Sequence, residues 1–227
     1  MNSQVVSKQR VADHGEVYTS AREVNAMLDL VQAETERIDS RFLEPACGSG
    51  NFLVEVLRRK LAVVQKRYAR SQLEYEMNAI VAAASVYGVD ILPDNVQTCR
   101  ERLLALWSEW YRATFPQSFK PQAVRCAEFI LERNILWGDA LSLKTPDDKA
   151  EPILFSEWSA VGATMIKRRD YTLAHLLDCR PFEGNNLFSD LGDEAFIPKP
   201  VQEFPWTHFL KVADSETPNH EPDTQLR

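Results

Sequence analysis

The sequence predicts an α/β fold with a parallel sheet. Three short apolar runs, at residues 42–44, 86–90 and 134–139, each end in an acidic residue. Helical patterns separate these runs, and strands that alternate with helices are typical of parallel βαβ units. An acidic residue at the end of a strand is the group that holds ribose hydroxyls in nucleotide-binding sheets. We therefore expect a sheet built to bind a nucleotide-like ligand.

Length and composition are those of a globular protein. The chain has 227 residues, of which 44% are hydrophobic and 26% charged, enough for one sizeable core with a small appendage. No apolar run of about 18 residues and no signal-peptide pattern occurs, which predicts a cytoplasmic protein without a membrane partner. The cysteines are widely spaced, so we expect reduced thiols and no metal site; they are Cys47, Cys99, Cys126 and Cys179.

The net charge of −7 is concentrated in the last third of the chain, where residues 151–227 carry 7 basic and 13 acidic side chains. Nucleic-acid-binding domains usually carry a basic footprint. The acidic balance weakens a nucleic-acid function without excluding it.

The segment 42–52 organises the prediction. Phe42 and Leu43 end a buried strand, which Pro45 stops because proline has no N–H to donate. Gly48-Ser49-Gly50 can form a tight turn before a helix that starts near Asn51. Glycines let a ligand approach the backbone, and the free N–H groups of a helix start can receive its polar groups. Glu44 is placed to accept hydrogen bonds from ribose hydroxyls or an amine.

Helical patterns fill the intervals around these strands. Ser20 and Glu23 form a capping box for a helix at 21–33. Further helices are predicted at 52–69, 71–84, 95–110 and 126–131, and a short one at 173–177. The helix at 52–69 has basic residues, on it and just after it, that we expect on its exposed side: Arg58, Arg59, Lys60, Lys66, Arg67 and Arg70. Gly50 and Asp90 are 40 positions apart, whereas the glycine loop and the acidic residue of a minimal dinucleotide fold are about 20 apart. The additional helix at 71–84 explains the greater separation.

Four strings, in this order, resemble motifs of the N6-adenine-specific DNA methyltransferases of restriction-modification systems. They are Gly15-x-x-Tyr18-Thr19, Glu44-Pro-Ala-Cys-Gly-Ser-Gly-Asn-Phe52, Gly88-Val-Asp90-Ile91 and Asn134-Ile-Leu-Trp-Gly-Asp139-Ala140. The resemblance implies a Rossmann-like fold that binds S-adenosylmethionine (SAM). It also implies the cofactor-binding residues, which are Tyr18, Thr19, Glu44, Ala46, Cys47, Gly48, Gly50, Asn51, Phe52, Asp90, Ile91, Asp139 and Ala140. In that family Asp139 would lie against the adenine amino group.

The resemblance does not reach the catalytic motif. The family has Asn/Asp/Ser-Pro-Pro-aromatic at the end of its fourth strand, and this sequence contains no Pro-Pro. No catalytic residue is therefore assigned. Residues 152–171 read as a β-hairpin that turns at Gly162, in which Ser156-Glu157-Trp158 could partly imitate the missing motif. Lys167-Arg168-Arg169 is expected on a solvated hairpin edge.

Residues 1–180 are thus predicted as a methyltransferase-like domain that is truncated at its C-terminal side, with 181–227 as an extended, partly disordered tail. The leading hypothesis is an adenine-specific DNA methyltransferase-like protein of a restriction-modification or phage-defence system. It would meet DNA directly or through a partner subunit, as an oligomer or in a complex with other defence proteins. One alternative is a non-catalytic SAM-binding regulatory or partner subunit, and another is an enzyme that methylates a different nucleophile.

Overall fold

The structure is a computed structural model that describes residues 19–177 and 199–214. Strands β1 (Phe42–Glu44), β2 (Val86–Asp90) and β3 (Ile135–Trp137) form a parallel sheet in the order β1-β2-β3. The predicted α/β class with a parallel sheet is confirmed. The third strand is shorter than predicted, because the preceding helix continues through Asn134. The predicted truncation at the C-terminal side stays a prediction.

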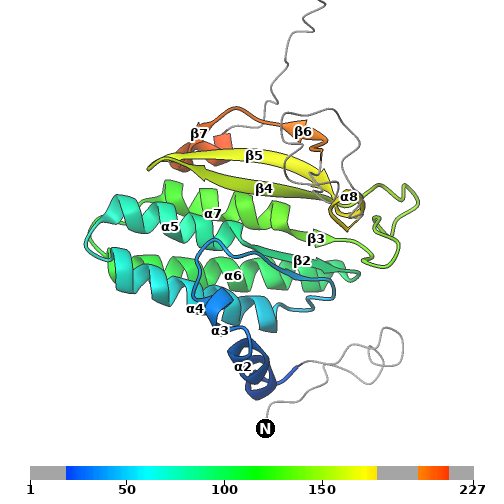
Figure 1. Cartoon of the computed structure of the whole chain (residues 1–227), viewed down its shortest axis with the longest axis horizontal. Coiled ribbons are helices and arrows are strands. Elements are labelled where there is room, and N and C mark those ends of the chain that lie inside the picture. Colours follow the sequence, from blue (N-terminus) through cyan, green and yellow to red (C-terminus); the bar gives the residue numbers. More distant parts are fainter. Residues whose placement is uncertain (1–18, 178–198, 215–227) are drawn as a thin grey trace, which may run out of the picture.

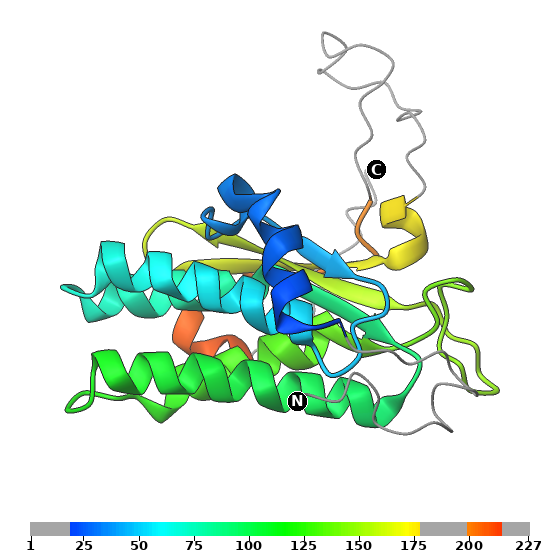
Figure 2. The same cartoon turned by 90° about the horizontal axis from the view of Figure 1, so that it is seen from below.

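Each crossover between parallel strands is a pair of helices. Helices α4 (Asn51–Tyr68) and α5 (Gln72–Ala84) connect β1 to β2, and α6 (Pro93–Thr114) and α7 (Pro121–Asn134) connect β2 to β3. The first helix of each pair leaves the sheet and the second returns, and Figure 2 shows the two pairs extending away from the sheet. Helix α7 is longer than predicted and has Pro121 in its first turn. Proline is tolerated there, because the N–H groups of the first turn make no hydrogen bond within the helix.

The predicted helix at 21–33 divides in two. Helix α2 (Ala21–Asp29) has the predicted capping box, in which Ser20 Oγ accepts the Glu23 amide and Glu23 Oε2 accepts the Ser20 amide. The amide of Leu30 bonds to the carbonyl of Met27 in a tighter turn, and a separate short helix α3 (Gln32–Thr35) follows. Helix α2 packs against α4.

A second layer covers the helices and one face of the sheet. Strands β4 (Leu154–Val161) and β5 (Met165–Thr172) form the predicted hairpin, with Gly162 at a φ of 63° in its turn. A short helix, α8 (Leu173–Leu177), follows. Figure 1 shows the hairpin above α5 and α7, with α4 and α6 on the side away from it.

Part of the predicted tail is packed on the domain. Strands β6 (Gln202–Glu203) and β7 (Thr207–His208) pair with β5, and a 3-10 helix, η2 (Phe209–Asp214), lies against α7. Phe204, Phe209 and Val212 are buried, so apolar anchors hold this segment. The predicted boundary at residue 180 therefore does not separate residues 199–214 from the domain. Residues 181–198 and 215–227 lie outside the described part.

The main core lies between the four long helices, and its largest buried side chains include Trp107, Tyr75 and Tyr111. Lys60 is also fully buried, which corrects its predicted exposed position. Its ammonium donates to the carbonyl of Ile38 (3.1 Å), the carbonyl of Ser40 and Oγ of Ser85 (2.7 Å). A buried cation needs such acceptors, since an unpaired one is costly. Lys60 therefore ties α4 to the segment before β1.

A smaller cluster joins the sheet to the hairpin; it consists of Tyr87, Val89, Ile153, Phe155 and Leu173. Tyr87 and Val89 alternate along β2 with Gly88, which faces Cys47 and Leu53 on the other side. Strand β2 is thus buried on both faces. Among the described residues, no helix is both long and apolar enough to cross a membrane.

Candidate functional site

The glycine loop after β1 is folded onto the end of β2. The amide of Cys47 donates to the carbonyl of Val89 (2.9 Å), and the amide of Gly50 closes a turn on the carbonyl of Cys47 (2.8 Å). Gly48 and Gly50 have φ angles of 51° and 83°, in the left-handed region that favours glycine. Gly50 then caps the N-terminus of α4. The predicted strand, tight turn and helix start are confirmed.

Two of these glycines are also required by close packing. A Cβ on Gly50 would lie 2.5 Å from Sγ of Cys99, and one on Gly88 would lie 2.9 Å from Sγ of Cys47. The hydrogen bond to Cys99, followed by burial, raises the pKa of the Cys47 thiol far above its usual value. Cys47 therefore serves as packing under the loop rather than as a nucleophile.

Asp90 fastens the loop to β2. Its Oδ2 accepts the amide of Gly48 (2.7 Å), and its Oδ1 accepts the amide of Leu92 (2.9 Å) and Nδ2 of Asn95 (3.2 Å). Asp90 is only 8% exposed. A carboxylate has about four lone-pair positions, so these three bonds leave about one for a ligand hydroxyl. The sequence predicted the position of Asp90 but not its role as an anchor of the loop.

Glu44, the last residue of β1, has a buried oxygen without a partner. Its Oε2 makes no hydrogen bond to any described residue. Burial, reinforced by the charge of Asp90, raises the pKa of Glu44 to about 8. An unpaired buried acceptor is costly, and a ligand that brings an N–H, an O–H or a positive charge would satisfy it. The carboxylate acceptors of this edge therefore fit the amine and ribose hydroxyls of SAM, which would donate to them.

A polar clamp holds the other side of the loop. Arg102 of α6 donates through Nη1 to the carbonyl of Ser49 (2.6 Å), to Oγ of Ser49 (3.1 Å) and to Oδ1 of Asn51 (2.9 Å). Nδ2 of Asn51 donates to the carbonyl of Thr19 (3.3 Å). The predicted residues Thr19 and Asn51 are thus brought together, while Tyr18 lies outside the described residues. Arg102 was not predicted as a site residue, since its partner Asn51 lies 51 positions away in the sequence.

The end of β3 contributes a flat aromatic surface that the sequence prediction missed. Trp137 pairs in register with Asp90, is 36% exposed, and donates from Nε1 to the carbonyl of Ile91 (2.9 Å). Ile91, a predicted site residue, is 48% exposed beside it. Exposed apolar side chains at this edge suit the stacking of a base. A tryptophan inside the predicted strand at 134–139, two residues before Asp139, was the available signal.

Asp139 lies just past β3, and its carboxylate is used by its own turn. Oδ1 accepts the amide of Leu141 (2.9 Å) and Oδ2 that of Ser142 (3.3 Å). These bonds hold the pKa of Asp139 below its usual value. The amide of Gly138 bonds to the carbonyl of Asp90 (3.0 Å), so this turn adjoins the loop-bearing edge. Ala140 packs against the smaller cluster.

The remaining predicted residues lie on the loop and the start of α4. Ala46 is exposed, and Phe52 packs partly buried on the main core. The structure thus gathers the described site residues at one edge, where Ile91 is exposed, Glu44 has a buried oxygen without a partner, and Cys47 and Phe52 act in packing. No cluster of metal-ligating side chains occurs in residues 19–177 and 199–214.

Ser156-Glu157-Trp158 does not imitate the missing catalytic motif. Its residues lie in the middle of β4, with Ser156 and Trp158 buried. Ser156 Oγ donates to Asp170 (2.7 Å) and Trp158 Nε1 to Asn134 (2.9 Å). The basic cluster after the turn is also paired rather than solvated; its ion pairs are Lys167–Glu203, Arg168–Asp170 and Arg169–Glu157. Both strings are therefore engaged in contacts within the protein.

One comparison with known families finds a match for part of the chain. Residues 24–108 match the family model of the RMKL-like methyltransferase domain. The match covers β1, the glycine loop, α4, α5, β2 and most of α6, including Glu44, Asp90 and Arg102. It supports a methyltransferase domain that uses SAM. No curated protein and no solved structure matches the chain.

Proposed function

We propose that the protein binds SAM at the carboxyl edge of the parallel sheet and methylates the N6 amine of adenine in DNA. The observation that supports this cofactor best is the buried, unpartnered Oε2 of Glu44 next to the glycine loop. The remaining acceptor position of Asp90 suits a ribose hydroxyl, and the exposed surface of Trp137 and Ile91 suits the adenine ring.

In this reaction the protein mainly has to position the methyl donor and the amine that accepts the methyl group. SAM supplies an electrophilic methyl group on a sulfonium sulfur. An amine can attack such a group in line once both are held at contact distance, and correct placement is worth several kcal/mol of barrier. An adenine in duplex DNA has to leave the stack to reach the site, at a cost of a few kcal/mol. The four motifs in order across residues 15–140 favour DNA adenine as the acceptor, in a restriction-modification or phage-defence setting.

Titration calorimetry with SAM and with S-adenosylhomocysteine tests cofactor binding. We expect one site for each ligand, and Arg102→Ala should weaken both while the surface variant Arg112→Ala does not. No measurable binding of either ligand by the full chain would contradict the proposal.

Transfer is tested with tritiated SAM and unmethylated duplex DNA, followed by nucleoside analysis for N6-methyldeoxyadenosine. The matched control is the same DNA already methylated at adenine N6. If label appears in RNA, protein or a small molecule but not in DNA, the protein is still a methyltransferase. The proposal that its substrate is DNA adenine would then be wrong.

A second candidate is a SAM-binding subunit that needs a partner for transfer. It is favoured by the lack of any Asn/Asp/Ser-Pro-Pro-aromatic string in the sequence and by the commitment of Ser156 and Trp158 to other contacts. This candidate would be supported if the protein alone binds SAM but transfers no methyl group, and if transfer begins once the products of neighbouring genes are added.

A further inference from the structure

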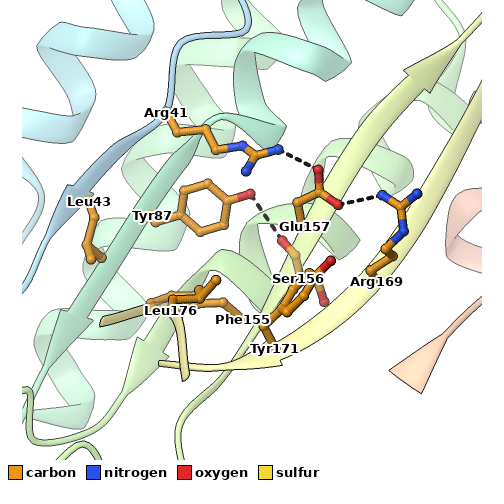
Figure 3. Close-up of a pocket in the computed structure, with 9 residues that line it drawn as sticks. All are labelled: Arg41, Leu43, Tyr87, Phe155, Ser156, Glu157, Arg169, Tyr171 and Leu176. Carbon is orange, nitrogen blue, oxygen red and sulfur yellow. Dashed lines mark hydrogen bonds and ion pairs between the residues drawn. The ribbon is translucent and has the colours of Figure 1, made fainter. Parts of the chain in front are cut away.

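A cavity separate from the glycine loop opens between the parallel sheet and the hairpin (Figure 3). Its volume is about 340 Å³. Leu43 of β1 and Tyr87 of β2 are register partners, so their side chains lie on the same face of the sheet. Phe155 and Tyr171 face them from β4 and β5, and Leu176 of α8 lies beside them.

The cavity exists because the hairpin covers only part of the sheet. Phe155 packs edge-to-face on Tyr87, with ring centroids 5.4 Å apart, and the Tyr87 hydroxyl donates to the carbonyl of Ser156 (3.1 Å). Beyond Tyr87 the cover stops, and Leu43 is 45% exposed. Parallel sheets are normally covered on both faces. An apolar floor is therefore left open next to β1.

One wall of the cavity is charged. Arg41 and Arg169 both pair with Glu157, and the Arg169–Glu157 distance is 3.0 Å. Burial opposes ionisation of Glu157, but the Ser159 hydroxyl and the two guanidinium groups hold its pKa below the usual value. Glu203 neutralises Lys167 at 2.6 Å and approaches Arg169 at 3.8 Å. Three cations therefore face two anions around this wall, a net charge of +1.

Arg41 is the cation of this wall with N–H donors available for a ligand. Its side chain is 56% exposed, and its one ion pair within the described residues is with Glu157. A guanidinium group carries five N–H donors, and paired donors match a carboxylate or another oxyanion. An apolar cavity with one available guanidinium at its rim is complementary to a molecule with an apolar body and an anionic end.

We propose that this cavity binds a small organic anion with an aromatic or aliphatic body, the body on Leu43 and Tyr87 and the anionic group at Arg41. The volume lies at the lower end of the range of about 300–1,000 Å³ for small-molecule sites, which favours a compact ligand. The site is distinct from the proposed SAM site, because Leu43 and Tyr87 lie on the face of the sheet opposite to Gly88 and the glycine loop.

The test uses two fluorescent probes with the same rings. The probe 1-anilinonaphthalene-8-sulfonate carries an anion, and N-phenyl-1-naphthylamine lacks it. We expect the wild-type protein to bind the sulfonate at one site and the neutral probe more weakly. Arg41→Gln should weaken the sulfonate about tenfold, the effect of losing one charge-assisted contact, and leave the neutral probe unchanged. Arg58→Gln, which removes an equal charge from α4, is the control.

A second variant tests the location. Leu43→Trp adds a ring inside the cavity and should abolish binding of both probes, whereas Leu30→Trp adds the same ring to an exposed position of the chain and should not. Near-ultraviolet circular dichroism and the Tm establish that each variant is folded, because these probes also bind partly folded chains. SAM affinity should be the same in all four variants, whatever the outcome for the proposed methyl transfer.

Three results would overturn the proposal: neither probe binds the wild-type protein, Arg41→Gln acts no more strongly than Arg58→Gln, or folded Leu43→Trp binds both probes as before.

Discussion

The amide of Gly48 donates to Oδ2 of Asp90 at 2.7 Å, across 42 positions of the chain. This bond joins the glycine loop to the end of the neighbouring strand, so the carboxylate fixes the shape of the loop. In the proposed SAM site the same side chain would also contact the ligand.

Replacing Asp90 should affect both properties. Asp90→Ala removes three acceptor contacts and leaves the half-buried Gly48 amide unpaired, so we expect a loss of about 2–4 kcal/mol in the free energy of unfolding. SAM affinity should fall at least tenfold. Urea unfolding and calorimetry measure the two effects. Asp139→Ala, which opens an exposed turn, should weaken SAM binding less, and equal effects from the two variants would contradict an anchoring role for Asp90.

Glu44 should make SAM binding depend on pH. With a pKa of about 8, the carboxyl group is largely protonated at pH 7 and has to lose its proton to meet a cationic ligand. SAM affinity should therefore rise from pH 6 to pH 8, by up to about tenfold per pH unit. The α-amino group of the ligand titrates in the same range, so the comparison is with Glu44→Gln, which should lack this part of the slope. Proton release, measured by calorimetry in buffers of different ionisation enthalpy, is the direct readout.

The same group should affect stability with a defined sign. Burial raises its pKa in the folded protein above the ordinary glutamate value of 4.5, so its contribution to stability is fully present below about pH 4.5 and is lost as pH rises toward 8. Glu44→Gln should remove that decline from a plot of unfolding free energy against pH. If Glu44→Gln still loses stability between pH 4.5 and pH 8, the loss originates in another titratable group.

Trp137 should contribute to SAM affinity through its ring. Trp137→Ala should weaken binding about tenfold, in line with about 1–3 kcal/mol for stacking of a base on an aromatic ring, and Trp137→Phe should restore part of it. The control is Trp206→Ala, which removes an exposed tryptophan from the segment after β6. Unchanged affinity in Trp137→Ala would show that the adenine ring lies elsewhere.

Comparing Gly50 with Gly162 distinguishes two ways in which an added side chain destabilises the protein, backbone strain and steric overlap. Both have positive φ angles, of 83° and 63°, but a Cβ at Gly162 meets no atom within 4 Å, while one at Gly50 meets Sγ of Cys99 at 2.5 Å. Gly162→Ala should cost about 1–2 kcal/mol, the price of the left-handed conformation alone. Gly50→Ala should cost more, and Cys99→Ala should relieve part of the excess in a double-mutant cycle. Equal costs at the two positions would contradict the close packing at Gly50.

Local patterns predicted the elements that carry the site. The strand, proline and glycines of 42–50 specify their turn through short-range geometry, and the capping box of α2 and the hairpin turn at Gly162 are equally local. The helix pairs were predicted in number, but the ends of α7 were not, although Pro121 in its first turn is a local signal for a helix start.

Long-range contacts could not be predicted in the same way. Trp137 becomes part of the edge only through the register of β2 and β3, and Lys60 is buried because the chain before β1 and Ser85 supply its acceptors. Arg41 meets Glu157 across 116 positions, which no spacing in the sequence indicates. Ser156 and Trp158 had suitable residue types for a catalytic string, but their burial in β4 places them elsewhere.

The paired-helix crossovers have a consequence for where this chain tolerates changes in length. Helix α5 ends at Ala84 and β2 begins at Val86, while α7 ends at Asn134 and β3 begins at Ile135, so each returning helix enters its strand almost without a linker. An extra residue at either junction would shift the strand by one position and exchange the side chains of its two faces. The turns at 69–71 and 115–120 lie at the other ends of the helices, and the 18 residues of α4 span about 27 Å. Insertions for labels or fused domains belong at Ala69 and Arg70, which are exposed. The turn at 115–120 is less suitable, because Phe119 packs on Tyr111 and Lys120 pairs with the buried Glu76.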